Sequence, residues 1–249
     1  MPQIDRNSDI PLYVQIKQKL DKRIKKLSPH MKIPSEPELA KKYQISRSTA
    51  KRAIDRLISE RKVYRIQGRG TFVAPPEIVR SFSELPSYSD DIRKLGLKPD
   101  VLHLSVTKQE PTVKIKNALR LSSTSKVWCV SRVRTADEEP VVHVISYVPV
   151  YLIPKLKKED VVYSLYEAMA SAIGLRPSWA NDTYRVETAI GERAKLLKIP
   201  NGTPILASER IAYLEDNRPV EYVESYIRGD RFAINVIIKS ATYLKNTKL

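Results

Sequence analysis

The chain has 249 residues, of which 42% are hydrophobic and 7% aromatic, with one cysteine and a formal net charge of +16. This length suffices for two domains, the composition is typical of a globular protein, and a single cysteine excludes an internal disulfide framework and a cysteine-rich zinc site. No apolar run approaches the ~20 residues that span a bilayer and the N-terminus is polar, so we expect a soluble cytoplasmic protein with no signal peptide and no membrane partner.

The positive charge is concentrated near the N-terminus. Residues 1–75 contain 18 Lys and Arg against 7 Asp and Glu, a net charge of +11, whereas residues 76–249 contain 26 against 21, a net charge of +5. A charge that served only solubility would be spread evenly, whereas a local excess is typical of a surface that binds a polyanion. We therefore expect the N-terminal part to bind nucleic acid, with an affinity that falls as salt rises.

The first predicted helix opens at Pro11, since proline is well tolerated in a first helical turn. Its apolar residues recur at helical spacing and predict one buried face. These residues are Leu12, Ile16, Leu20, Ile24 and Leu27. We expect this helix to pack behind the two helices that follow it.

Two short helices are predicted next. Ser35 and Glu38 have the spacing of a capping box, and the helix that they open runs to about Tyr43. After a two-residue turn, Ser46 caps a second helix that runs to about Glu60. Two short helices joined by such a turn predict a helix-turn-helix.

The second of these helices has hydrogen-bond donors throughout its first two turns. They are Arg47, Ser48, Thr49, Lys51 and Arg52. A recognition helix presents such side chains to base edges and phosphates in the major groove. The alternative is a solvated basic face on an ordinary helix, and the helix-turn-helix context favours the first interpretation.

A β-hairpin is predicted after the helices, from residues 63–66 and 71–73. Gly68 and Gly70 permit the positive φ angles of a tight turn and place Arg69 at its tip. This hairpin has the form of a wing that could reach a phosphate or the minor groove.

Together these motifs resemble the winged-helix domain of the GntR superfamily of transcription factors. The matching residues, all within 9–74, are Pro11-Leu12-Tyr13, Pro34-Ser35-Glu36, Glu38-Leu39-Ala40, Ser46-Arg47-x-Thr49, Leu57 and Gly68-x-Gly70-Thr71-Phe72-Val73. The resemblance implies that this part contacts double-stranded operator DNA. The residues implied are Ser35, Arg47, Thr49, Lys51 and the wing from Gly68 to Thr71.

Two positions depart from the pattern of this family. Lys51 stands where the family usually has arginine, and lysine cannot make the bidentate contact to guanine. Gln44 stands where the family often has glycine, so a left-handed turn there would cost about 1 kcal/mol. We therefore expect an operator sequence that differs from those of relatives.

The sequence Ala74-Pro75-Pro76 ends the wing, because two prolines stop a strand and form a stiff joint. We expect a DNA-binding domain at residues 1–75, a linker at 76–82 and a second domain at 83–245. The second domain mixes strands and short helices, which predicts an α+β fold with an antiparallel sheet. The expected strands are 102–109, 126–135, 141–148, 177–188, 205–213, 220–227 and 232–238, and the expected helices lie near 89–95, 113–119, 164–173 and 191–197.

A weak internal repeat lies within this domain. Arg132 precedes Pro140 by eight residues, and Ser146-Tyr147 follows that proline at six and seven; Arg210, Pro219 and Ser225-Tyr226 repeat the pattern with one extra residue before the proline. Each unit predicts a β-hairpin, turning at residues 137–139 and 216–218. We expect two related hairpins in one sheet.

This second domain resembles the UTRA effector-binding domain of the HutC subfamily of GntR regulators, which has a chorismate-lyase-like fold. The resemblance covers roughly residues 80–240 and rests on Arg132-x-Arg134, the strand from Pro140 to Pro149, Leu196 with Pro200-x-Gly202, and Glu221-Tyr222 followed by Arg228-x-Asp230-Arg231. It implies a homodimer that binds a small anionic effector, with a sugar phosphate expected, and no cofactor.

The candidate effector residues combine two arguments. Arg132 and Arg134 leave a strand on the same face and suit a phosphate or carboxylate, although a surface pair balanced by nearby acids is the open alternative. Ser164 begins a helix, where it could cap the backbone or bind an anion. The resemblance implies that the ligand's anionic group lies at Ser164 and Tyr166. It also implies pocket positions at Glu221 and Arg228.

Two pocket positions depart from members that respond to amino-sugar phosphates, which tend to have Glu where Val144 stands and Tyr where Ile227 stands. The anion-binding half is therefore retained and the sugar-binding half altered, which argues against a ligand of the N-acetylglucosamine-6-phosphate type.

The favoured function is an effector-responsive transcriptional regulator, most often a repressor. A dimer would place two recognition helices about one DNA turn apart on a palindrome. The alternatives are a regulator without an effector, a regulator of a carboxylate or amino-acid-derived ligand, and an enzyme. The three histidines, His30, His103 and His143, show no metal-ligand spacing and no nucleophile-base set is recognised, so we expect no catalytic residue, no metal site and no enzymatic activity.

Overall fold

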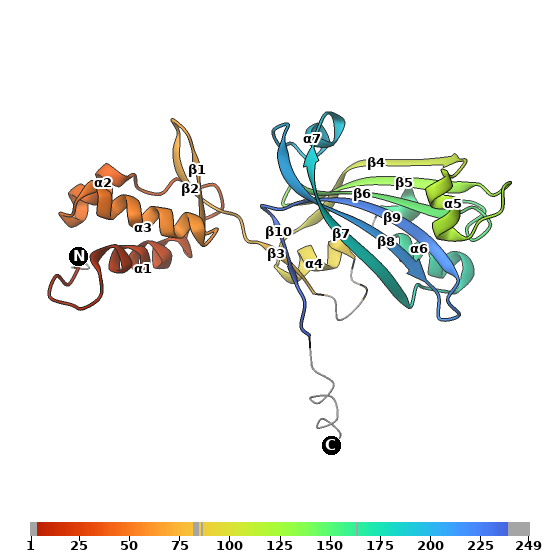
Figure 1. Ribbon diagram of the computed structural model, residues 1–249, viewed down its shortest axis with the longest axis horizontal. Helices are drawn as coiled ribbons and strands as arrows, with labels where there is room; N and C mark the ends of the chain where they lie inside the picture. The colour runs from red at the N-terminus through yellow and green to blue at the C-terminus, as the bar shows by residue number, and fades with distance from the viewer. Residues whose placement is uncertain (1–3, 82–84, 86, 163, 239–249) are drawn as a thin grey trace, which may run out of the picture. The chain divides into compact units, whose positions relative to one another are not determined.

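The computed structural model describes residues 4–81, 85, 87–162 and 164–238 (Figure 1). The chain divides into two compact units, Met1–Pro76 and Glu77–Leu249. Each unit has its own hydrophobic clusters.

The N-terminal unit is a winged helix-turn-helix. Its elements are α1 (Leu12–Ile24), α2 (Glu36–Tyr43), α3 (Arg47–Ser59), β1 (Val63–Ile66) and β2 (Gly70–Val73). The apolar face predicted for the first helix is confirmed, because Ile16 and Leu20 of α1 are buried in one cluster with Ile54 and Leu57 of α3. This packing fixes α3 against a second helix and leaves its polar side exposed.

Local signals set the ends of these helices. The Ser35 hydroxyl and the Glu38 carboxylate form the predicted capping box at the start of α2, and the Ser46 hydroxyl accepts a bond from the Thr49 N–H at the start of α3. Between the helices, Gln44 has φ 51° and ψ 48°, the left-handed conformation anticipated from the sequence. The turn is therefore made by a residue with a Cβ where glycine would be unstrained.

Replacing Gln44 with glycine should stabilise the N-terminal unit. Removal of the Cβ relieves the left-handed strain, and we expect a gain of up to about 1 kcal/mol, less the larger chain entropy that glycine adds to the unfolded state. Calorimetry of the full chain should show the N-terminal transition rising by up to about 4 °C. Gln67 has no positive φ, so Gln67→Gly is the matched control and should not raise the transition.

The wing is an antiparallel hairpin in which Val63 pairs with Val73 and Ile66 with Gly70. Gly68 and Gly70 have φ angles of 73° and 121°, so both glycines occupy the conformations that the sequence predicted. The segment before α2 adds to this hairpin, since the His30 N–H donates to the Val73 carbonyl at 2.9 Å.

The C-terminal unit is built on a six-stranded antiparallel sheet in the order β4-β5-β6-β9-β8-β7 (Figure 1). Its strands are β4 (Pro99–Gln109), β5 (Val127–Ala136), β6 (Glu139–Pro149), β7 (Trp179–Ala189), β8 (Thr203–Tyr213) and β9 (Pro219–Arg228). A two-stranded parallel sheet joins β3 (Ile78–Ser81) to β10 (Phe232–Asn235). The helices are α4 (Tyr88–Lys94), α5 (Val113–Leu119), the 3-10 turn η1 (Glu159–Val161), α6 (Leu165–Ile173) and α7 (Glu192–Leu196).

The predicted α+β fold is confirmed, and the two related hairpins β5–β6 and β8–β9 are neighbours through the β6–β9 pairing. The linker prediction needs correction, because residues 78–81 form β3. Ile78 is fully buried and pairs with Phe232. The partner lies at the other end of the domain, and so no local pattern indicated a strand. At the C-terminal end, the strand expected to reach residue 238 stops at Asn235.

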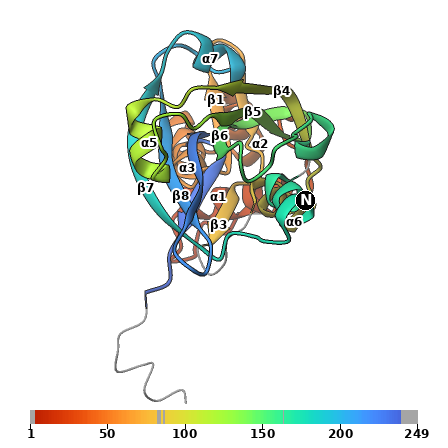
Figure 2. The same ribbon diagram turned by 90° about the vertical axis from the view of Figure 1, so that its right-hand side faces the viewer.

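Helices cover both faces of the large sheet (Figure 2). Leu165 and Met169 of α6 pack with Val130 and Val148 on one face. On the other face, α5 packs through residues such as Leu119 against Val127 and Tyr222. Because successive strand residues point to opposite faces, Arg132 and Arg134 lie on the α6 side.

His143 lies on the opposite side of the sheet from these arginines and predicts an acid sensitivity. The ring is 7% exposed and its Nε2 lies 2.7 Å from the Ser131 hydroxyl. Burial, assisted by the charges of His103 and Arg193, lowers the pKa of His143 to about 4 from an ordinary 6.5. The unfolded chain therefore binds this proton more readily than the folded chain.

The resulting stability is fully present above about pH 6.5 and is lost as the pH falls towards 4. The whole shift corresponds to about 3 kcal/mol. Urea unfolding at pH 7 and pH 4.5 should show this loss in the wild type and a smaller loss in His143→Gln. The exposed His30 of the N-terminal unit supplies the control: His30→Gln should keep the wild-type dependence. An unchanged pH dependence in His143→Gln would show that His143 is not the group responsible.

Candidate DNA-binding surface and effector pocket

The N-terminal end of α3 presents the predicted recognition residues. Arg47, Ser48, Lys51 and Arg52 are exposed, and Thr49 is half-buried. The Ser46 hydroxyl lies 2.8 Å from the Ser48 hydroxyl and 2.7 Å from that of Thr49. These hydroxyls thus also organise the first turn, while the basic side chains project from it.

Three of the basic side chains predicted to contact DNA are available to a polyanion. Within the part of the chain that the structure describes, Arg47, Lys51 and Arg69 make no hydrogen bond or ion pair. Arg52 differs, because its guanidinium lies 4.1 Å from the centre of the Tyr13 ring of α1. Arg52 therefore also helps to hold α3 on α1.

An ion-pair cluster ties the wing to the helix-turn-helix. Arg65 of β1 lies 2.6 Å from Glu36 of α2 and 3.3 Å from Asp55 of α3. Because one arginine contacts both helices, the hairpin that ends in Arg69 has a defined position beside them. The structure thus brings α3 and the wing together within one unit.

One predicted DNA contact needs correction, and a second residue has an additional structural role. Thr71 is 5% exposed, so its side chain is buried within the unit and is not presented to DNA, while its carbonyl accepts the Ile33 N–H at 2.9 Å. The reason is strand alternation, which places Thr71 with Val73 on the inner side of β2. The Ser35 hydroxyl donates to Glu38 at 2.8 Å, and the bonds from Ser35 lower the pKa of Glu38. Ser35 is therefore committed first to capping α2.

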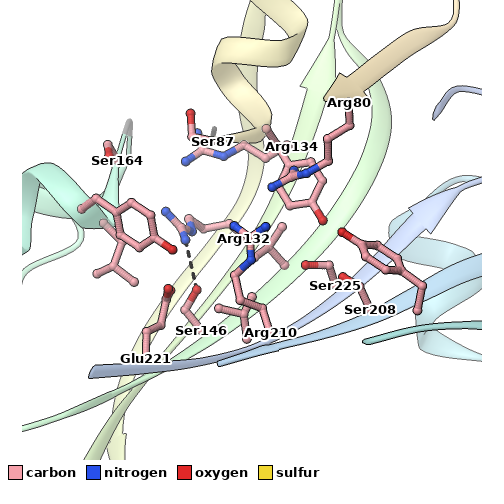
Figure 3. A pocket seen from close by; sticks show the side chains of 16 residues that line it. Arg80, Ser87, Arg132, Arg134, Ser146, Ser164, Ser208, Arg210, Glu221 and Ser225 are labelled. Carbon is pink, nitrogen blue, oxygen red and sulfur yellow. Dashed lines mark hydrogen bonds between the residues drawn. The ribbon is translucent and has the colours of Figure 1, made fainter. Parts of the chain in front are cut away.

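The C-terminal unit has a hollow of about 610 Å³, partly open to solvent, on the α6 side of the sheet (Figure 3). Charged, hydroxyl and apolar side chains line it: Arg80, Arg132, Arg134, Arg210 and Glu221; Ser87, Tyr88, Ser146, Ser164, Tyr166, Tyr184, Ser208 and Ser225; and Val144, Leu165 and Val223. The pocket is thus rich in cations and hydroxyls.

Five of the six predicted effector residues lie together here: Arg132, Arg134, Ser164, Tyr166 and Glu221. Arg228 does not line the pocket. Its guanidinium donates to Asp230 at 2.6 Å and to the Pro140 carbonyl at 3.0 Å, and it lies 2.8 Å from Glu139. Arg228 therefore holds the end of β9 to the β5–β6 turn, where acidic partners already satisfy its charge.

Arg132 has the chemistry of an anion-binding group. It is 6% exposed and donates to the Ser146 hydroxyl at 3.2 Å and the Val161 carbonyl at 3.3 Å, both of which are neutral acceptors. Its Nε has no hydrogen-bond partner among the described residues. Burial lowers the pKa of Arg132 in spite of the opposing charge of Glu221, so the charged form is only partly compensated. An anion would supply that compensation.

Glu221 lies beside Arg132 with an unsatisfied oxygen. It is 2% exposed, and its Oε2 finds no hydrogen-bond partner in the part of the chain described. Burial raises the pKa of Glu221, and the neighbouring Arg132 opposes that rise. The carboxyl group can therefore accept a bond from a ligand hydroxyl or, when protonated, donate one to an anion.

The helix end beside these groups is capped. The Ser164 hydroxyl accepts the Glu167 N–H at 3.2 Å, and the Glu167 carboxylate binds Arg176 at 2.6 Å instead of returning to the cap. Arg134 donates to the Val162 carbonyl at 2.6 Å just before this helix. Capping is thus an observed role of Ser164, and the same residue also lines the pocket.

Sequence reasoning missed several pocket residues. Arg210, Ser146 and Ser225 were visible as members of the internal repeat, which could have identified them as paired positions on one sheet face. Arg80 lies on the unforeseen β3, where it stacks over Tyr88 at 4.1 Å. Of the two unusual positions, Val144 lines the pocket floor, whereas Ile227 is buried outside it.

A cationic pocket on an antiparallel sheet and a basic winged helix-turn-helix together define a one-component transcriptional regulator. Comparison with known families agrees: residues 12–73 match the bacterial regulatory proteins of the gntR family, and residues 94–233 match the UTRA domain. The chain belongs to the GntR family of DNA-binding transcriptional regulators with a UTRA domain, and it is not an enzyme.

Relatives of similar length share this organisation. The chain is 31% identical over 231 residues to the HTH-type transcriptional repressor NagR of Bacillus subtilis, covering 92% of this chain and 95% of that protein. It is 26% identical over 244 residues to the probable fructoselysine utilization operon transcriptional repressor of Escherichia coli, covering 95% and 98%. The crystal structure of PhnF from Mycobacterium smegmatis has the same fold, with a TM-score of 0.67, 23% identity, and coverage of 90% and 99%.

None of the described helices is both long and apolar enough to cross a membrane.

Proposed function

We propose that this protein is a repressor whose affinity for a palindromic operator is set by a small anionic metabolite, and that the metabolite is a phosphorylated sugar or amino sugar. The main support is the buried Arg132 guanidinium, whose hydrogen-bond acceptors are neutral and whose Nε is unsatisfied within the described chain. A phosphate oxygen would accept a hydrogen bond from Nε and would bring a negative charge to the guanidinium.

The shape and hydroxyl content of the pocket favour a sugar for the rest of the ligand. The hollow of about 610 Å³ presents serine and tyrosine hydroxyls above the apolar Val144 and Val223. Two relatives point the same way, since one is named NagR and the other is named for fructoselysine utilization. A carboxylate ligand is the alternative, because Arg132 would bind it equally well.

For DNA binding we propose that Arg47, Ser48, Thr49, Lys51 and Arg52 enter the major groove and that the wing, through Gly68, Arg69 and Gly70, contacts the backbone or minor groove. Two copies of the chain would bind the two halves of the palindrome. The linker is proposed to be the short Ala74-Pro75-Pro76 segment. The protein would work in the cytoplasm, where bacterial DNA is found.

The chain itself suggests how the ligand could act on DNA binding. Arg80 lines the pocket from β3, and β3 starts at Ile78, directly after the Pro75-Pro76 joint. A ligand that binds Arg80 better in one arrangement of this strand would shift the populations of the two arrangements. The ligand can change operator affinity only by as much as its own affinities for the two arrangements of β3 differ.

A thermal-shift screen of the full chain tests the proposal. Glucose 6-phosphate, glucosamine 6-phosphate and fructose 6-phosphate should each be compared with the unphosphorylated sugar and with citrate. The proposal expects stabilisation by at least one sugar phosphate and release of the operator by the same compound. Stabilisation by citrate alone would support the carboxylate alternative, and a regulator without an effector would respond to none.

A further inference from the structure

The pocket floor is built twice from the internal repeat. Strand pairing places the equivalent residues of the repeat on two neighbouring rungs, each of which is a row of paired residues across β5, β6, β9 and β8. The order of the equivalent residues along one rung is the reverse of their order along the other. One rung is Arg132, Val144, Ser225 and Ser208; the other is Val130, Ser146, Val223 and Arg210. The two units of the repeat are therefore related by a local two-fold axis. This places Arg132 at one end of the pocket floor and Arg210 at the other, with apolar and hydroxyl side chains between them.

The two equivalent arginines are compensated differently. Arg210 donates from Nε and Nη2 to the two carboxylate oxygens of Asp182, both at 2.6 Å, and the Tyr184 hydroxyl donates to the same carboxylate at 3.0 Å. Arg132, in contrast, donates to a hydroxyl and a carbonyl. Both units of the repeat therefore contain the arginine, but only Arg210 has a carboxylate that accepts two of its hydrogen bonds.

The remaining cation at the Arg210 end also faces an acid. Arg80 lies 3.6 Å from Asp91 of α4, and both side chains are buried. At this end each arginine therefore has its own carboxylate partner outside the pocket lining, so its charge is already compensated before a second anionic group of a ligand arrives. Among the pocket-lining residues described, the only acidic side chain is Glu221, whose charge acts on both Arg132 and Arg210.

We propose that Asp182 is a specificity residue, which neutralises Arg210 so that the pocket accepts an anionic group at the Arg132 end and rejects ligands with a second anionic group at the other. This inference rests on the proposed function and narrows it: the effector has one anionic head, and its other end is neutral and hydroxylated. Selectivity comes from the missing attraction at that end, since a second phosphate would meet an arginine whose charge Asp182 already neutralises.

The proposal predicts a gain of function from one isosteric change. Asp182→Asn retains a carbonyl oxygen for Arg210 but removes the negative charge, so the second arginine becomes available to an anion. The ratio of dissociation constants for glucose 1,6-bisphosphate and glucose 6-phosphate, measured by calorimetry on the full chain, should exceed about tenfold in the wild type. In Asp182→Asn that ratio should fall by about tenfold or more.

Two further variants separate charge from damage. Asp182→Asn combined with Arg210→Gln removes both charges and should return the ratio towards the wild-type value. Asp216→Asn is the matched control, because Asp216 binds Arg218 at 2.6 Å in an exposed turn outside the pocket. It should leave the ratio unchanged. Thermal melting of each variant identifies any that fails to fold, and the double variant then decides whether the Arg210 charge is needed.

The outcomes separate a failure of this inference from a failure of the proposed function on which it rests. If Asp182→Asn leaves the ratio unchanged while Arg132→Gln weakens binding of both compounds, Asp182 is not a specificity residue and the proposed anion site stands. A wild type that prefers the bisphosphate overturns the inference in the same way. If the wild type binds glucose 6-phosphate but Arg132→Gln has no effect on that binding, the proposed anion site itself is wrong.

Discussion

Arg47→Ala should weaken operator binding by about 1–3 kcal/mol, roughly 5- to 150-fold, and should reduce the preference for operator over random duplex. Arg47 is the first residue of α3, exposed, and without a hydrogen bond or ion pair within the described residues. In the proposed role of Arg47, its loss removes a donor to base edges and not only a charge. Fluorescence anisotropy with both duplexes at one fixed salt concentration measures the two affinities.

The matched control for this prediction is Arg23→Ala. Arg23 is also an exposed arginine, on the last turn of α1. Its removal should lower both affinities by a similar small factor, because a general charge contributes to random and operator duplex alike. Equal effects of the two substitutions on specificity would mean that α3 is not the recognition helix.

Arg132→Gln should abolish the response to the effector. Loss of one partner of a buried, hydrogen-bonded charge pair costs about 2–5 kcal/mol, which corresponds to a loss of affinity of roughly 30- to several thousand-fold. The operator complex should then persist at ligand concentrations that release the wild type. A ligand titration of the preformed operator complex, followed by anisotropy, measures this directly.

Two variants control for structural damage in that experiment. Arg132→Lys keeps the charge but loses the planar fork, and it should recover part of the response. Arg218→Gln removes an exposed arginine that pairs with Asp216 in the β8–β9 turn, and it should respond as the wild type does. If Arg132→Gln were released by the ligand at wild-type concentrations, the anionic head would have to bind elsewhere.

Local signals explain why so much of the fold could be predicted. Capping serines, glycines with positive φ and alternating strands act over a few residues, and the structure has the helix starts at Glu36 and Arg47 and both glycine conformations of the wing. The strand β3 could not be found in this way. Its partner β10 lies about 150 residues later, and burial of Ile78 against Phe232 depends on that distant pairing.

The site was less predictable for a similar reason. Strand spacing correctly placed Arg132 and Arg134 on one face, but it could not show that acids at Asp230 and Glu139 occupy Arg228. Nor could it show that Thr71 faces inwards, since a short wing strand has two possible faces. Arg210 and Asp182 form a pair across β7 and β8, so the importance of Asp182 emerges only when the sheet order is known.

The most direct test of the whole account is one anisotropy titration of the full chain on a palindromic duplex selected from a random pool, performed with and without a stabilising sugar phosphate. The account predicts binding at least about a thousandfold tighter than to random duplex at moderate salt, and a weaker complex when the sugar phosphate is present. Equal affinity for selected and random duplex would contradict the central claim that the basic N-terminal unit recognises an operator.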